Sequence, residues 1–155
     1  MYKKILAPLD GSEFAECILE HVKTIGSGCR VPEVVLLRVV EPLSAETVSA
    51  LATAGNNYLR EALLDSKNEA QAYLDQKKEE LEKDGLSVQT AAVDGDPATE
   101  ILDYVKNNGV DLILISTHGK SGIARWFFGS VAQKVLTHAA VPVLMTSPPG
   151  CRVTP

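Results

Sequence analysis

Apolar residues gather in four short and nearly continuous runs, at positions 3–9, 34–40, 111–116 and 141–145. Runs of this kind are typical of strands that helices cover on both faces, because neither face of such a strand meets water. A fifth run, at 87–93, alternates more strongly between apolar and polar positions and predicts one further strand.

Helical periodicity fills the intervals between these runs. Residues 13–25 and 58–84 each repeat apolar side chains along one helix face, and Ser12 is placed to cap the first of these helices. Two shorter helices are expected to begin at Asp96, which precedes a proline, and at Ser130. The side chains expected to face the core are Phe14, Ala15, Ile18, Leu19, Val22, Ile25, Leu59, Ala62, Leu63, Ala70, Tyr73, Leu74, Leu81, Ile101, Leu102, Val105, Val131, Val135 and Leu136.

Residues 42–57 are rich in Ala, Ser and Thr, and we expect a loop there with at most one helical turn. Strands and helices otherwise alternate, which predicts an α/β fold: an open, Rossmann-like parallel sheet with right-handed crossovers and helices on both faces. The length of 155 residues fits one domain, which we place at 1–147. A flexible tail rich in Pro and Gly is expected at 148–155.

The final apolar run extends from Val141 to Met145 and carries Pro142 near its start. Proline cannot donate to a strand ladder, so this run is predicted to form an edge strand. An exposed edge favours pairing with another strand, and a second copy of the same chain is the simplest partner. We therefore expect a homodimer that pairs through this strand.

Composition narrows the classes of function. The net charge is −5, which argues against the basic face that nucleic-acid binding needs. No apolar run approaches the roughly 20 residues of a membrane span, and the N-terminus does not resemble a signal peptide, so a cytoplasmic location is expected. The three cysteines and three histidines show no metal-ligand spacing, and we expect no metal site made by protein side chains alone.

Ligands of open α/β sheets bind outside the carboxyl ends of the strands, and several polar and glycine-rich segments are expected at that edge. Those that follow the first, second and fourth strands contain Pro8, Leu9, Asp10, Val39, Ile115, Ser116, Thr117, His118, Gly119, Lys120, Ser121 and Gly122. Asp10 is either a turn residue or a contact to ribose or Mg²⁺, and its place at a strand end favours the contact.

A second element at this edge is the helix that follows Gly129. Ser130 and Gln133 form an S-x-x-Q pattern, which predicts a capping box with Ser130 as the N-cap. A helix start presents free N–H groups and a positive dipole end to an anion, and a preceding glycine allows close approach. Together with a possible nest at Gly119 and Gly122, this arrangement suits a di- or triphosphate.

Catalytic motifs are absent from the sequence. Gly119-Lys120-Ser121 resembles the end of a Walker A loop, but Leu114 occupies the position of that motif's first glycine. His118 lacks an orienting carboxylate and is better explained as a turn residue, while Lys120 is equally well explained as a phosphate contact or as a solvated side chain. Phosphoryl transfer needs a positioned nucleophile, so at most weak hydrolysis of ATP is expected.

Four motifs together resemble the universal stress protein family: ILAPLDGS, GDPATEIL, DLILISTHGKSG and FFGSVAQKVLTHAAVPVLM. ATP-binding members of that family carry G-x2-G-x9-G-[S/T]. Gly119, nine further residues and then Gly129-Ser130 match its second and third glycines, whereas Ser116 occupies the position of the first. We expect this serine to weaken nucleotide binding without abolishing it.

The resemblance implies a fold of the adenine nucleotide alpha hydrolase-like type, with strand order 3-2-1-4-5, a homodimer through the last strand, and ATP in the cleft. It places Pro8, Leu9 and Asp10 beside adenine and ribose, and the Val39 backbone at the adenine edge. Ile115 and Ser116 would lie beside the ribose. The phosphates would be held by Gly119, Gly122, Gly129, Ser130, Val131 and Ala132.

Three functions follow as hypotheses. The first is an ATP-binding, dimeric module of a stress response, with Mg²⁺ bound through the phosphates and Asp10 as a candidate ligand. The second is a dimeric interaction module that binds AMP or cyclic AMP, or no nucleotide. The third is a slow ATPase.

Overall fold

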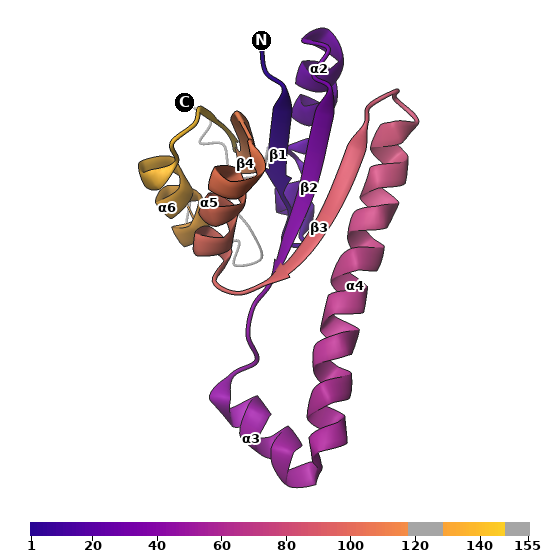
Figure 1. Ribbon diagram of the computed structural model, residues 1–155, viewed down its shortest axis with the longest axis vertical. Coiled ribbons are helices and arrows are strands. Elements are labelled where there is room, and N and C mark those ends of the chain that lie inside the picture. Colours follow the sequence, from indigo (N-terminus) through magenta and orange to yellow (C-terminus); the bar gives the residue numbers. More distant parts are fainter. Residues whose placement is uncertain (118–128, 148–155) are drawn as a thin grey trace.

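The computed structural model describes residues 1–117 and 129–147, which form one parallel sheet with helices on both faces (Figure 1). The strands are β1 (Lys4–Pro8), β2 (Glu33–Val40), β3 (Val88–Asp94), β4 (Leu112–Ser116) and β5 (Val143–Thr146). Their order across the sheet is β3-β2-β1-β4-β5, and every neighbouring pair is parallel. The predicted fold class and strand order are confirmed, with β5 at one edge and Pro142 immediately before it.

Each face of the sheet has its own apolar core. One face is covered by α1 (Glu13–Glu16), α2 (Leu19–Gly28) and α4 (Asn56–Glu82), and the other by α5 (Pro97–Asn108) and α6 (Ser130–His138). Side chains of β1 alternate between the two cores, with Ile5 in the first core and Leu6 in the second. All five residues of β4 are buried, which explains why its sequence is a continuous apolar run.

The segment expected as one helix at 13–25 is two helices. Ser12 caps α1 as predicted, because its Oγ accepts a hydrogen bond from the Ala15 amide at 3.2 Å. The chain then turns, with the Ile18 amide donating to the Ala15 carbonyl at 3.3 Å, before α2 begins. Phe14 of α1 is 38% exposed, so the prediction that it faces the core is wrong.

The loop expected at 42–57 is also wrong, because most of it forms the helix α3 (Ala45–Ala54). Ser44 caps this helix by accepting a hydrogen bond from the Thr47 amide at 3.2 Å. The segment combines alanines of high helix propensity with this cap, but its apolar residues are less concentrated on one face than those of α2 and α5, so the periodic signal is weak.

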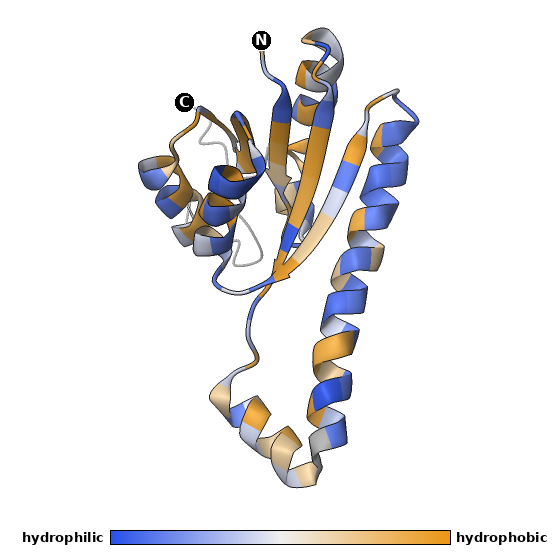
Figure 2. Cartoon of the chain, viewed as in Figure 1, coloured by the Kyte–Doolittle hydropathy of each residue, from blue (hydrophilic) through white to orange (hydrophobic). Residues whose placement is uncertain are grey.

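The long helix α4 has two unlike parts. Ala70, Leu74 and Leu81 are fully buried against the sheet, as predicted. Leu63 was expected to face the core but is 50% exposed, and Leu64 beside it is 51% exposed. Figure 1 shows that α3 and the first part of α4 form a hairpin that projects beyond the sheet, and Figure 2 shows apolar positions along that hairpin.

Two further features complete the fold. The prediction that Leu136 of α6 faces inward is wrong, since it is 45% exposed, whereas Val135 is fully buried. No helix within the described ranges is long and apolar enough to cross a membrane.

The two parts of α4 should differ in their contribution to stability. Leu74→Ala removes a fully buried side chain and should lower the free energy of unfolding by about 2–5 kcal/mol. Leu64→Ala, the same change on the same helix at a half-exposed position, should change it by no more than about 0.5 kcal/mol. Urea titration followed by circular dichroism measures both, and equal losses would contradict the packing described above.

Candidate functional site

A cavity of about 330 Å³ lies at the carboxyl edge of the sheet, within the range of about 300–1,000 Å³ that is typical of small-molecule sites. The described residues that line it are Pro8, Leu9, Asp10, Ala15, Leu37, Val39, Glu41, Asp96, Pro97, Ala98, Ile101, Ile115, Ser116, Thr117, Gly129, Ser130, Val131, Ala132 and Lys134. They come from the carboxyl ends of β1, β2 and β4, from Ala15 of α1, and from α5 and α6, mainly near the starts of these two helices.

The turn after β1 is held by its own side chains. Asp10 Oδ1 accepts hydrogen bonds from the Ser12 amide at 2.9 Å and from Ser12 Oγ at 2.6 Å. Ser12 Oγ in turn accepts from the first turn of α1. Asp10 is therefore a turn residue, and it also lines the cavity, so the two roles considered from the sequence are compatible.

The start of α6 forms an opposing wall. Gly129 is the N-cap and Ser130 is the first helical residue, so the predicted capping box with Ser130 as N-cap is wrong. Glycine has no side chain with which to cap the helix, and in the described part of the chain no side chain accepts from the Ser130, Val131 and Ala132 amides. These amides and the positive dipole end of the helix are therefore available to an anion.

A backbone hydrogen bond closes this wall onto the end of β4. The Gly129 amide donates to the Thr117 carbonyl at 2.7 Å. A Cβ at position 129 would lie 3.1 Å from that same oxygen, which is tighter than ordinary packing. Glycine therefore allows α6 to start directly beside β4.

The start of α5 is capped, in contrast to α6. The Asp96 carboxylate accepts from Thr99 Oγ1 at 2.7 Å and from the Thr99 amide at 3.1 Å. These two hydrogen bonds, with a smaller contribution from the charge of Lys134, lower the pKa of Asp96. An anion in the cavity would meet a carboxylate at α5 and open amides at α6.

The remaining charges are unevenly placed. Asp10, Glu41 and Asp96 contribute three carboxylates to the described lining, and Lys134 contributes one amine. Carboxylates accept hydrogen bonds from amino groups and hydroxyls, so this part of the cavity suits a nucleobase amine and sugar hydroxyls better than phosphate.

Ser116 lies at the end of β4, at the position of the first glycine in the sequence motif. It is 7% exposed, and its Oγ is buried with no hydrogen-bond partner among the described residues. A buried hydroxyl without a partner costs free energy, so a ligand atom or water that reached it would be favoured.

The structure brings together every described residue that the sequence predicted for the site. Pro8, Leu9, Asp10 and Val39 come from β1, β2 and the turn after β1, and Ile115, Ser116, Thr117, Gly129, Ser130, Val131 and Ala132 come from β4, α6 and the residues next to them. His118, Gly119, Lys120, Ser121 and Gly122 lie outside the described residues, so the expected second anion nest is not placed. No cluster of three metal-ligating side chains occurs within residues 1–117 and 129–147.

Sequence reasoning missed one wall of the cavity, which is formed at the start of α5 by Asp96, Pro97 and Ala98. A signal was present, since Asp96-Pro97 directly follows the carboxyl end of a predicted strand, where the general rule for parallel sheets places ligands. Lys134 was also missed, and it carries no comparable signal.

Comparison with known proteins places these features in context. The model of the universal stress protein family matches residues 1–147. Universal stress protein MJ0577 of Methanocaldococcus jannaschii is 36% identical over 154 residues and covers 94% of each chain. The solved structure of MJ0577 is similar with a TM-score of 0.79 at 34% identity, over 96% of this chain and 97% of that one.

Two solved structures with bound ligands have the same fold at lower identity. A universal stress protein in complex with cAMP has a TM-score of 0.65 at 16% identity, over 94% of this chain and 97% of that one. An Arabidopsis thaliana protein of the same family, with AMP bound, has a TM-score of 0.64 at 16% identity, over 94% of this chain and 91% of that one.

The Asp96 cap can be tested by its titration. Nuclear magnetic resonance of the side-chain carboxyl should give a pKa below the 3.8 of an unperturbed aspartate. Because the folded-state pKa is lowered, the cap stabilises the protein above about pH 4, and this contribution is lost as the pH falls through the folded-state value. Thr99→Val removes the Oγ1 donor and should raise the pKa of Asp96 part of the way back to 3.8. An unchanged pKa in this variant would contradict the assigned cap.

Proposed function

Because the chain belongs to the universal stress protein family, we propose that it binds an adenine nucleotide, with ATP as the first candidate, in the cavity at the carboxyl edge of the sheet. The observation that carries the proposal is the uncapped start of α6, where Gly129 brings open amides to the end of β4. Such a helix start binds phosphate without needing a basic side chain.

The contrast between the two helix starts gives the nucleotide a direction. The phosphates lie at the amides of Ser130, Val131 and Ala132, because α5 presents the Asp96 carboxylate instead. The base and ribose lie toward Asp10 and Val39, where carboxylate and backbone acceptors meet amino and hydroxyl donors. The proposal assigns Mg²⁺ to the phosphates, with Asp10 as the nearest candidate ligand from the protein.

A smaller phosphate group is the alternative, and Ser116 is the observation that favours it. Its side chain occupies space that a glycine would leave open at the end of β4. The structural relatives with bound cAMP and AMP show that this fold accepts monophosphates in those proteins. AMP and cyclic AMP are therefore the competing ligands for this chain.

The proposed biological role is that of a dimeric regulatory module in a stress response, in which nucleotide occupancy is read by a partner protein. Pairing of β5 with β5 of a second copy would continue the sheet across the dimer, because β5 is an edge strand. The cytoplasmic location expected from the sequence stays a prediction.

Nucleotide binding is tested by isothermal titration of the purified protein with ATP, AMP and cyclic AMP. Gly129→Val places a branched side chain against the Thr117 carbonyl and should weaken ATP binding by at least about tenfold, since the phosphate wall can no longer close. Gly28→Val is the matched control, because a Cβ at Gly28 meets no atom within 4 Å, and it should leave the affinity unchanged.

Two results would overturn the proposal. One is the lack of any adenine nucleotide binding, together with no shift in melting temperature across the nucleotide panel. The other is unchanged ATP affinity in Gly129→Val with native circular dichroism. Tighter binding of AMP or cyclic AMP than of ATP would select the alternative ligand.

The dimer is tested by light scattering after size exclusion. Val143→Lys places a charge on the edge strand and should shift the protein toward a monomer, because buried charge disfavours strand pairing between copies. Leu136→Lys makes the same change on an exposed position of α6 and should leave the dimer intact. A wild-type monomer at high concentration, or a folded Val143→Lys dimer, would refute pairing through β5.

A further inference from the structure

The strand β2 begins with Glu33, and its other charged residue is Arg38. Arg38 is not among the residues that line the cavity. Its neighbours Leu37 and Val39 both line the cavity. Because successive side chains of a strand point to opposite faces, Arg38 lies on the face that α1, α2 and α4 cover. The guanidinium of Arg38 therefore does not contact a ligand in the cavity directly, and its role depends on its contacts with the protein.

The guanidinium packs flat against Gly11, in the turn between Asp10 and Ser12. A Cβ placed on Gly11 would lie 3.2 Å from Cζ, 3.2 Å from Nη2 and 3.3 Å from Nη1 of Arg38. Three nearly equal distances mean that the plane of the group, rather than its edge, faces the glycine. Gly11 also has φ of +85°, so a side chain there is disfavoured by both backbone conformation and space.

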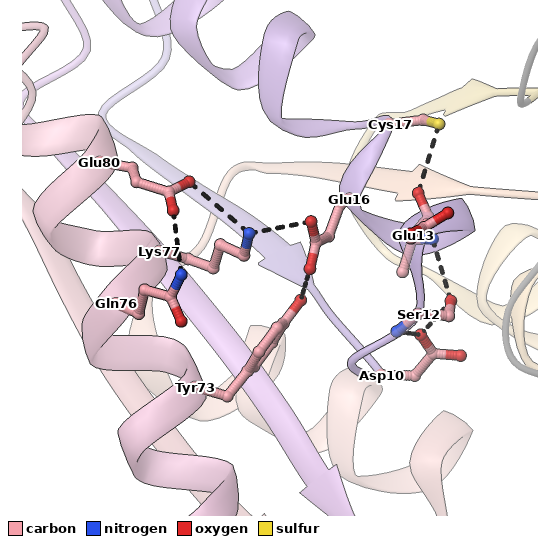
Figure 3. A network of polar contacts seen from close by, with 10 residues as sticks. Asp10, Ser12, Glu13, Glu16, Cys17, Tyr73, Gln76, Lys77 and Glu80 are labelled. Atoms are coloured by element: carbon pink, nitrogen blue, oxygen red, sulfur yellow. Dashed lines mark hydrogen bonds and ion pairs between the residues drawn. The ribbon is translucent and has the colours of Figure 1, made fainter.

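The same guanidinium lies over the ring of Tyr73 on α4, with Cζ 5.0 Å from the ring centroid. The ring is itself fixed, because the Tyr73 hydroxyl donates to Glu16 Oε1 at 3.0 Å (Figure 3). Lys77 Nζ holds the other carboxylate oxygen of Glu16 at 2.9 Å. Burial, followed by the Glu16 carboxylate, raises the pKa of Tyr73, so its hydroxyl keeps the proton that it donates.

Stacking is therefore the contact that the structure gives Arg38. No carboxylate in residues 1–117 or 129–147 forms an ion pair with it. Tyr73 of α4 contacts Arg38, and Arg38 contacts Gly11. Gly11 in turn is flanked by Asp10, which lines the cavity, and by Ser12, which caps α1.

We propose that Arg38 is a positioning residue for the nucleotide site: it holds the Asp10–Ser12 turn in place from the face of the sheet that α1, α2 and α4 cover. The effect of Arg38 on nucleotide binding rests on the proposed function, whereas its effect on the turn does not depend on any ligand. Lysine should not replace arginine here, because an ammonium group has no planar face to lie against Gly11 and Tyr73.

The first test needs no nucleotide. In Arg38→Met, hydrogen exchange of the Ser12 amide, which donates to Asp10 Oδ1, should become about tenfold faster, as expected of a turn that opens more often. The Leu9 amide donates to the Leu37 carbonyl at 2.8 Å and should keep its protection, because sheet pairing is unaffected. Unchanged exchange at Ser12, or equal acceleration at Leu9, would overturn the proposal.

The second test is a double-mutant cycle on nucleotide affinity. Arg38→Met and Arg38→Lys should each weaken ATP binding by about tenfold, an effect of the size expected from loss of preorganisation at one contact. In the background of Asp10→Ala, Arg38→Met should have little further effect, since Arg38 acts through the turn that presents Asp10. Full additivity, or full affinity in Arg38→Lys, would contradict the assigned role.

Lys67→Met is the control for both tests. It removes an ion pair between α4 and Asp94, with 2.8 Å between Nζ and Oδ2, and it does not touch the turn. Ser12 exchange and ATP affinity should both stay at wild-type values in this variant. If the wild-type protein binds no nucleotide while Arg38→Met still accelerates exchange at Ser12, the proposed function fails and the positioning role stands.

Discussion

The parallel pairing of β1 with β2 on one side and with β4 on the other governs the geometry of this protein. The helices that follow β1 cover one face of the sheet, whereas α5 and α6, which come before and after β4 in the chain, cover the other, so the two strands mark a switch point at the carboxyl edge. A crevice at this switch point is a consequence of topology and precedes any choice of side chain. The residues discussed above determine only what the crevice can hold.

What it can hold is decided by how two helix starts are capped. Asp96 closes the start of α5 with a carboxylate, while Gly129 leaves the start of α6 open. One cavity thus has an end that accepts hydrogen bonds and an end that donates them, which matches a molecule with a hydrogen-bond-donating base or sugar and an anionic tail. Among the described residues that line the cavity, Lys134 is the one basic side chain, so this polarity comes from helix capping, in keeping with a net charge of −5.

The sequence predicts the strands well because buried parallel strands produce continuous apolar runs, and it predicts α5 and its cap because Asp96 and Pro97 are strong local signals. It fails where structure depends on the surroundings of a segment. The apolar residues of α3 are only weakly concentrated on one helix face, so periodicity does not reveal it. The contact of Arg38 with Gly11 and Tyr73 joins three segments far apart along the chain, and only the fold brings them together.

The hairpin of α3 and the first part of α4 turns at Gly55, whose φ is +136°. Figure 1 shows that this turn lies at the end of the hairpin farthest from the sheet, and neither core nor the described lining of the cavity includes a residue of α3. The chain can therefore gain or lose residues at Gly55 without displacing a buried side chain or a residue of the site. Insertions or deletions at this turn would change the length of the hairpin while the sheet and its crevice stay the same.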